Sequence, residues 1–224
     1  MERTRQWFQG LWLYPAIGFA LFTASPCNSS PASSGSRQTG TAAASDKSGT
    51  HIDVMCIGDR INNPPEPFHY SYKYADASGS ADKEADITPQ SMDITIQDKS
   101  GSHKYHGIRS DEASWSRAVV DLSGLNLTAM SSRLDSLNGT SAIVQQGPEA
   151  MNGYSATRYA IDTNGANASD KNKFETFFGK GSFEKGTVWM GNDGCGVKLV
   201  LEEGIWQANG GVKQAHYEMA MIKK

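Results

Sequence analysis

Cys56 and Cys195 are the residues most able to do covalent chemistry in the C-terminal part of this 224-residue sequence. The third cysteine, Cys27, lies next to an apolar N-terminal segment with the features of an export signal. In an exported chain the remaining two cysteines are expected to pair as a disulfide, and the alternative is two buried free thiols. Closing so long a loop would stabilise the fold by roughly 4–5 kcal/mol.

Catalytic and metal-binding motifs are missing from the sequence. It contains no Gly-x-Ser-x-Gly, no His-Glu-x-x-His, no phosphate-binding Gly-Lys-Ser/Thr and no dinucleotide-binding fingerprint. His103 and His106 have a spacing that brings two side chains together on a helix, but on the expected strand they point to opposite faces. We therefore expect no enzyme activity, no metal site and no cofactor. An unrecognised enzyme would need a cleft with several convergent polar groups.

The residues around Cys27 resemble the N-terminus of bacterial lipoproteins. A charge-free run from Leu11 to Ala24 is shorter than the ~20 residues of a membrane-spanning helix, so residues 1–26 are expected to be a signal peptide. The resemblance implies cleavage before Cys27 and its acylation, for example with palmitate, although Pro26 stands where the family has Gly, Ala or Ser. The alternative is a soluble secreted protein, or a periplasmic one, with a free N-terminal cysteine.

Two further segments complete the expected domain organisation. Residues 27–49 consist almost entirely of Ser, Ala, Gly, Thr and Pro, a composition typical of a disordered tether. Residues 50–224 are long enough for one domain with its own core. The formal net charge is −3 and no basic cluster is present, which argues against a nucleic-acid partner.

Hydrophobic periodicity predicts separate groups of helices and strands in residues 50–224. Alternating strands are expected at 68–75, 91–98 and 102–109, with a polar loop after the first of them. Two helices are expected next, one capped by Ser110 and one spanning about 128–137. Two more strands, a short helix carrying Phe174, Phe177 and Phe178, and a C-terminal meander follow. This pattern is typical of an α+β domain with a largely antiparallel sheet.

The meander resembles the bacterial lipoprotein-carrier superfamily. "GPEAMNGYSATRYAID" (147–162) and "GTVWMGNDGCGVKLVLE" (186–202) are similar to paired strands of the LolA/LolB-like and LprG/LppX-like proteins. The resemblance covers about a third of the domain. It implies a single α+β domain with a curved antiparallel sheet, an incomplete barrel, and helices packed on its concave face. It also implies an apolar cavity that accepts acyl chains.

The helices supply apolar stripes that could line such a cavity. The candidate residues are Trp115, Val119, Leu122, Met130, Leu134, Phe174, Phe177 and Phe178. An apolar stripe on a helix more often belongs to a solid core than to a cavity wall, and the sequence does not distinguish the two. The sequence therefore supports two functions. The first is a lipoprotein, anchored in the bacterial cell envelope, that carries a lipid or other apolar ligand without catalysis. The second is a tethered interaction module with a filled core that binds an envelope protein.

Overall fold

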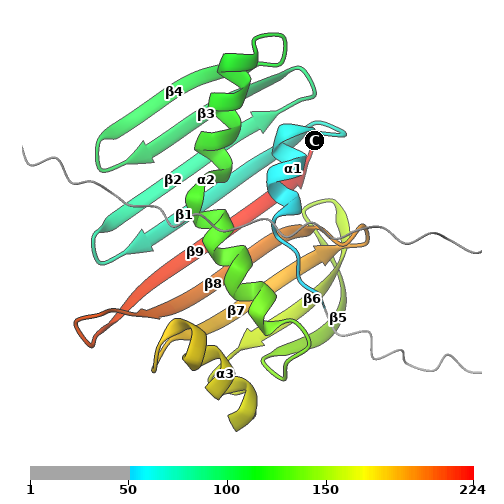
Figure 1. The fold of residues 1–224 in the computed structure, drawn as a ribbon. Helices are drawn as coiled ribbons and strands as arrows, with labels where there is room; N and C mark the ends of the chain where they lie inside the picture. Colours follow the sequence, from blue (N-terminus) through cyan, green and yellow to red (C-terminus); the bar gives the residue numbers. More distant parts are fainter. Residues whose placement is uncertain (1–50) are drawn as a thin grey trace, which may run out of the picture. The chain divides into compact units, whose positions relative to one another are not determined.

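The computed structural model describes residues 51–224, apart from the side chains of residues 124–126. The expected signal peptide (1–26), the expected acylation site at Cys27 and the expected tether (27–49) lie outside the described residues. The described part folds into three helices and nine strands (Figure 1). In chain order these are α1 (Cys56–Asn62), β1 (Phe68–Asp76), β2 (Gly79–Ile87), β3 (Ser91–Asp98), β4 (Gly101–Ile108), α2 (Glu112–Leu137), β5 (Ile143–Met151), β6 (Tyr154–Asp162), α3 (Ala168–Phe178), β7 (Phe183–Gly191), β8 (Gly196–Trp206) and β9 (Val212–Lys223).

All nine strands form one antiparallel sheet in the order β4-β3-β2-β1-β9-β8-β7-β6-β5. The first four strands form one meander and β5–β8 form a second, and β9 pairs with β1 on one side and β8 on the other. The sheet is open and curved, with β4 and β5 as its two edges and the helices on one face (Figure 1). The predicted α+β architecture with a curved antiparallel sheet is therefore confirmed.

Helix α2 crosses the helix-bearing face of the sheet and provides most of its cover (Figure 1). The helix begins after Asp111, whose carboxylate accepts hydrogen bonds from the backbone N–H groups of Ala113 and Ser114. The prediction of Ser110 as the cap was wrong by one residue. The prediction of two helices was also wrong, because α2 is continuous through Gly124. A glycine inside a helix costs only about 1 kcal/mol, less than the packing of this long apolar face returns.

Strand β2 occupies the segment that was expected to be a polar loop. It pairs with β1 over the whole length of both strands, from Phe68 opposite Ile87 to Asp76 opposite Gly79. Its helix-facing residues include Ala81, Lys83 and Ala85, so the strand lacks the strong apolar alternation of its neighbours. Tertiary pairing with β1 and β3 makes this weakly patterned segment a strand.

The disulfide between Cys56 and Cys195 attaches α1 to the turn between β7 and β8. The two Cα atoms are 5.7 Å apart, and 139 residues separate the cysteines in sequence. Asp53 forms a parallel bridge with Cys195 and accepts a hydrogen bond from the N–H of Gly196. The predicted disulfide is thus present, and it fixes α1 at one end of the sheet.

The opposite face of the sheet is polar. Cross-strand pairs join His69 Nδ1 to Asp86 at 2.9 Å and His106 Nδ1 to Asp93 at 2.7 Å. His103 pairs with Ile96 of β3 and belongs to the helix-bearing face, so it points away from His106. Its Nε2 atom lies 2.9 Å from Oγ of Ser100. Within residues 51–224, no group of three or more His, Cys, Asp or Glu is placed to hold a metal ion. Nor does any helix in this range have the length and apolar character needed to span a membrane.

Candidate functional site

The residues predicted to line a cavity lie mostly in a packed core. Met130 and Leu134 have 0% exposed surface, and Trp115, Leu122 and Phe174 are also buried. A side chain with no accessible surface borders no space wide enough for a water molecule, and still less for an acyl chain. The α2 stripe therefore packs directly onto the sheet in this structure.

Three of the predicted residues lie outside this core. Val119 and Phe178 are half-buried, and Phe177 is 78% exposed. Val119 borders a groove of about 240 Å³ between α1 and α2, together with Met55 and Leu127. Phe177 points away from the core near the C-terminal end of α3. The predicted set is thus divided between a solid core, a shallow groove and an exposed surface.

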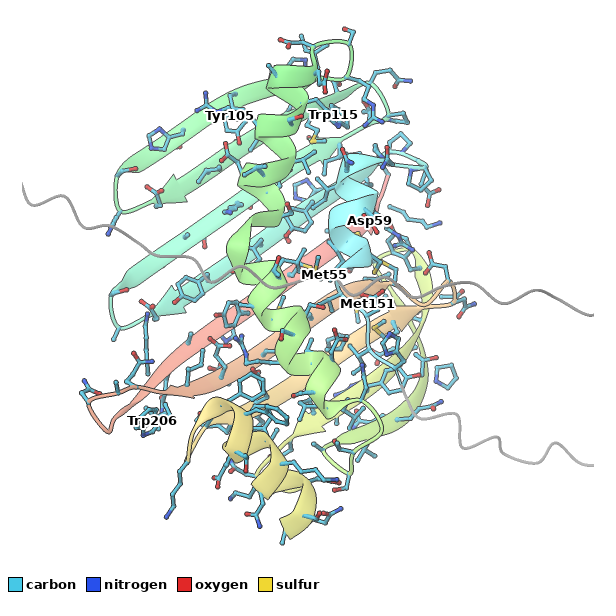
Figure 2. The ribbon with its side chains drawn as sticks, viewed as in Figure 1. Met55, Asp59, Tyr105, Trp115, Met151 and Trp206 are labelled. Carbon is cyan, nitrogen blue, oxygen red and sulfur yellow. A yellow bond between two sulfur atoms is a disulfide. The ribbon has the colours of Figure 1, made fainter. Side chains whose placement is uncertain are left out.

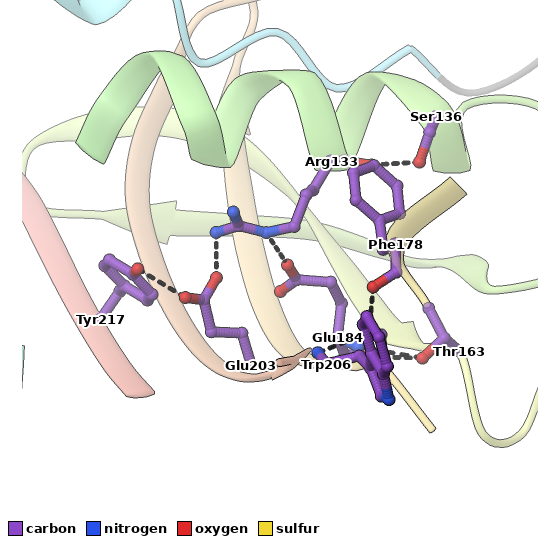
Figure 3. A network of polar contacts seen from close by, with 9 residues as sticks. Arg133, Ser136, Thr163, Phe178, Glu184, Glu203, Trp206 and Tyr217 are labelled. Atoms are coloured by element: carbon purple, nitrogen blue, oxygen red, sulfur yellow. Dashed lines mark hydrogen bonds and ion pairs between the residues drawn. The ribbon is translucent and has the colours of Figure 1, made fainter. Parts of the chain in front are cut away.

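A buried ion network lies between the C-terminal half of α2 and the sheet (Figure 3). Arg133, from α2, donates through Nε to Glu184 of β7 and through a terminal guanidinium nitrogen to Glu203 of β8. The hydroxyl of Tyr217, from β9, donates to the second oxygen of Glu203 at 2.6 Å. The network therefore links α2 to three adjacent strands.

Strand register explains why the two carboxylates meet. Glu184 and Glu203 are paired residues of β7 and β8, so their side chains project from the same face. On β8 this face also carries Leu199 and Leu201, which are fully buried. Glu203 thus follows Val197, Leu199 and Leu201 as the fourth residue of an otherwise apolar inward row. An Arg on α2 at the level of this pair compensates part of the buried negative charge.

Burial dominates the electrostatics of the network. It raises the pKa of Glu184 to about 7; the neighbouring Glu203 raises that pKa further, and Arg133 opposes the shift. Burial also raises the pKa of Glu203, against the effect of Arg133. Burial opposes the charge on Arg133 itself, but the two carboxylates outweigh this effect and raise its pKa. One guanidinium faces two carboxylates, so the site favours retention of one proton near neutral pH.

The network is closed to solvent. Glu184 has no exposed surface, and its Oε2 atom has no hydrogen-bond partner among the described residues. The Tyr217 hydroxyl is used as a donor to Glu203, and Arg133, Glu184 and Glu203 are all buried. The arrangement can hold α2 on the sheet and respond to protonation, but it does not resemble a catalytic site.

An exposed aromatic patch lies beside the network, at the junction of α3 with the hairpin between β8 and β9. We define this aromatic patch as Phe177, Phe178, Trp206 and Val212. The rings of Phe177 and Phe178 have centroids 6.5 Å apart, and Trp206 is paired with Val212 across the hairpin. Trp206 is 41% exposed. Trp206 lies beside the β8–β9 hairpin (Figure 2), and Ser182 links its backbone to that of Phe178, so exposed apolar side chains from α3 and from the hairpin gather at one end of the sheet.

Local hydrogen bonds and a glycine fix the aromatic patch in place. Ser182 Oγ donates to the carbonyl of Phe178 at 2.6 Å and accepts from the N–H of Trp206 at 3.0 Å. Gly179 ends α3 with φ +94°, and a Cβ atom there would lie 2.6 Å from Cβ of Trp206. Only glycine permits both this backbone conformation and this close approach.

Lysines surround the aromatic patch, but acidic partners neutralise two of them. Lys213 Nζ lies 2.6 Å from Asp76, and Lys173 Nζ lies 3.6 Å from Asp170. Lys180 follows the helix without an ion pair in the part of the chain described here. The surroundings of the aromatic patch are therefore close to charge-neutral.

The sequence prediction missed the ion network and the exposed position of Trp206. A signal for the network was present, because period-two alternation places Glu203 in line with Val197, Leu199 and Leu201. A charged residue at an inward strand position indicates a buried partner of opposite charge. The pairing of that residue with Arg133 depends on where α2 crosses the sheet, which the alternation does not reveal.

Comparisons of the sequence with protein-family models and with curated proteins found no match. Among solved structures, MucB in complex with MucA(peri) matches 76% of this chain at 9% identity, with a TM-score of 0.28. This chain spans 56% of the length of MucB. LprF from Mycobacterium bovis matches 73% of this chain and 87% of its own at 12% identity, with a TM-score of 0.27. At these identities and TM-scores, neither likeness carries an argument about the family or the function of this chain.

Proposed function

We propose that this domain is a non-enzymatic binding module of the cell envelope that recognises a protein partner through the aromatic patch. The filled helix-bearing face of the sheet is the observation that carries this proposal. With Met130 and Leu134 at 0% exposure, the apolar stripe of α2 is already used in the fold. The exposed apolar side chains that remain for recognition include Phe177 and Trp206.

Two properties of the aromatic patch favour a protein partner over a lipid bilayer. Large aromatic side chains, Trp in particular, supply much of the energy of protein interfaces. An anionic membrane surface attracts clustered unpaired lysines, whereas Lys173 and Lys213 have acidic partners here. The aromatic patch is therefore matched to an apolar, largely uncharged segment of another protein.

Lipid carriage is the second candidate function, and the groove between α1 and α2 favours it. Val119, Met55 and Leu127 give this groove an apolar wall that an acyl chain could contact. A chain buried between α2 and the sheet would require α2 to move away from the sheet and the Arg133 contacts to break. Transfer of the apolar chain from water would contribute about 25 cal/mol per Å² of buried surface.

The proposed cellular location follows from the N-terminal sequence. A signal peptide at residues 1–26, acylation of Cys27 and a tether at 27–49 would hold the domain near the outer surface of a membrane. The intact mass of the denatured protein, purified from its own membranes, tests this point. A diacylated chain beginning at Cys27 supports the anchor, and an unmodified chain beginning elsewhere excludes it.

The partner proposal is tested with a photo-crosslinking residue placed at position 177 of the full chain. We expect a discrete protein adduct whose yield falls at least about tenfold when Trp206→Ser is added. The same crosslinker at Val144, an exposed apolar position on edge strand β5, is the control and should give no such adduct. Equal adducts at both positions would contradict the proposal.

Native mass spectrometry of the same full-length protein separates the two functions. A stoichiometric lipid that remains bound in Phe177→Ser would support carriage and overturn the protein-binding assignment. A lipid-free protein that binds its crosslinked partner would support the interaction module.

A further inference from the structure

A second site lies at the opposite end of the strands from the aromatic patch. Strand β8 runs from Gly196 to Trp206, so its two ends are about 35 Å apart. At the Gly196 end, a cleft of about 350 Å³ lies among the end of α1, the start of β1, two hairpin turns and the end of β9. We refer to this space as the end cleft. The C-terminus lies close to α1 at this end (Figure 1).

The walls of the end cleft are fastened by contacts between distant segments. The disulfide holds α1 to the turn between β7 and β8. The N–H of Asn192 in that turn donates to the carbonyl of Ser155 on β6 at 3.3 Å. The N–H of Lys223 on β9 donates to the carbonyl of Asn152 in the β5–β6 turn at 3.1 Å. These contacts join four of the five segments, and the pairing of Phe68 on β1 with Lys223 on β9 joins the fifth. The cleft is thus held in one arrangement before any ligand arrives, which lowers the entropic cost of binding.

Gly153 allows β9 to lie close to the turn between β5 and β6. It has φ +83°, and a Cβ atom there would lie 3.1 Å from Cβ of Lys223. A larger residue would push the side chain of Lys223 away from the neighbouring Tyr154. Glycine therefore lets the Lys223 side chain lie directly against the turn, with its ammonium 4.9 Å from the centroid of the Tyr154 ring.

Two cations approach the ring of Tyr154 inside the end cleft. The Lys223 ammonium lies 4.9 Å from the ring centroid, and the Arg60 guanidinium carbon lies 5.8 Å from it. Each cation also has an acidic partner on the rim, Glu66 for Lys223 at 2.7 Å and Asp193 for Arg60. Both acids are largely exposed, whereas the Arg60 side chain is only 16% exposed.

A ligand can replace the acidic partners of Arg60 and Lys223 in the end cleft. Ion pairs with an exposed member contribute only about 0–1 kcal/mol, so a ligand can replace them at little cost. Burial lowers the pKa of Arg60, and nearby Tyr154 and Glu66 offset this effect only in part. The guanidinium therefore gains from an additional anion, and the displaced carboxylates then need a cation.

From this geometry we infer that the end cleft binds a small zwitterion with a phosphate or carboxylate group and an ammonium group. Arg60 and Lys223 hold the anionic group, and Glu66 and Asp193 hold the ammonium next to the face of Tyr154. The exchange of partners is charge-neutral. Such a zwitterion is available both as a free metabolite-like molecule and as the headgroup of a lipid.

Isothermal titration of the full chain with phosphoethanolamine tests the inference. We expect saturable binding that weakens at least about tenfold in Arg60→Gln and, separately, in Lys223→Gln, because each loses a charge-assisted hydrogen bond. Arg109→Gln is the matched control, since Arg109 stacks on Trp115 at 4.7 Å outside the end cleft, and it should bind like the wild type. Equal affinity in the wild type and both cleft variants, or no saturable binding, would overturn the inference.

Further arms of the experiment identify the recognised groups and their source. Inorganic phosphate alone and ethanolamine alone should each bind at least about tenfold more weakly than phosphoethanolamine, since each satisfies half of the site. Glu66→Gln with Asp193→Asn should reduce binding of phosphoethanolamine but not of phosphate, and an equal loss for both would contradict the ammonium assignment. Binding of the full chain to vesicles of phosphatidylethanolamine, compared with vesicles of phosphatidylcholine, tests the lipid source. Arg60-dependent binding to the phosphatidylethanolamine vesicles indicates a lipid headgroup, and binding of phosphoethanolamine without binding to either vesicle indicates a free molecule. Because the aromatic patch is remote, loss of partner binding in Phe177→Ser leaves this test unaffected.

Discussion

Glu184 combines complete burial, a guanidinium neighbour and a carboxylate neighbour in one position. Its pKa is raised from 4.5 to about 7 in the fold by burial. Between these two pH values the folded chain holds a proton that the unfolded chain has released. The contribution of Glu184 to the free energy of unfolding is therefore fully present below about pH 4.5 and is lost as the pH rises to about 7.

The variant Glu184→Gln should remove this pH dependence. We expect the wild type to lose about 1–3 kcal/mol more stability than Glu184→Gln between pH 5 and pH 8, because Gln mimics the protonated acid at both values. Urea denaturation at the two pH values measures the difference. Glu218→Gln, on the polar face of the sheet, should follow the wild type, and parallel curves for all three proteins would contradict the assignment.

Arg133 is expected to be the most sensitive member of the network. Arg133→Leu leaves Glu184 and Glu203 buried without a counter-charge, and should lower the free energy of unfolding at pH 8 by about 3–5 kcal/mol. Adding Glu184→Gln and Glu203→Gln to the same protein should restore much of that loss. A single variant as stable as the wild type would mean that the network does not hold α2 in place.

At this scale the sequence predicts some residues well and others not at all. Cys56 and Cys195 could be paired because they were the two cysteines left after Cys27. Glu203 could be placed inward by alternation. Its contacts with Arg133 and Tyr217 depend on the position of α2 and on strand order, which are properties of the assembled sheet.

Helix α2 is the element that separates a filled core from a ligand cavity. Leu134→Ala should lower the free energy of unfolding by about 2–5 kcal/mol, since it removes methyl groups from a fully packed site. Val120→Ala is the matched control on the same helix, because Val120 is 65% exposed, and it should change stability by less than about 0.5 kcal/mol. Equal small effects in thermal unfolding would indicate that Leu134 faces an open cavity.

The elements with strong periodicity were predictable, and those with weak periodicity were not. The alternation of Phe68, Tyr70 and Tyr72 identifies β1, whereas the Ala and charged residues of β2 do not identify that strand without its neighbours. Gly124 lies between the two helices expected from the sequence, and its low helix propensity favours a break there. The packing of both halves of α2 on one sheet outweighs that signal, and packing is not a local property.

The disulfide acts on the whole molecule because its loop contains most of the domain. Cys56→Ser with Cys195→Ser should lower the free energy of unfolding by roughly 5 kcal/mol, since the unfolded chain regains the freedom of a loop of 139 residues. Denaturation of the oxidised protein, the reduced protein and the double variant measures this effect. The reduced wild type and the double variant should agree, and a double variant as stable as the oxidised protein would contradict the estimate.

The overall architecture followed from the order of elements, since adjacent antiparallel strands joined by short turns leave few alternatives. Whether the helices enclose a cavity did not follow, because apolar stripes on a helix are the same for a packed core and a lined pocket. The end cleft could not be predicted from the sequence either. Its charged residues, Arg60, Glu66, Asp193 and Lys223, come from four segments that meet only after the sheet curves.

The place of β9 has a consequence for how the molecule is made. This strand follows the other eight in the chain, yet it is the fifth of nine in the sheet and the only described strand that joins the two meanders. During synthesis at about 5–20 residues per second, the edges of β1 and β8 stay unpaired until β9 has been made. Open strand edges favour aggregation, so holding the chain unfolded until its last strand emerges protects it. The complete sheet can therefore form only after β9 has been made.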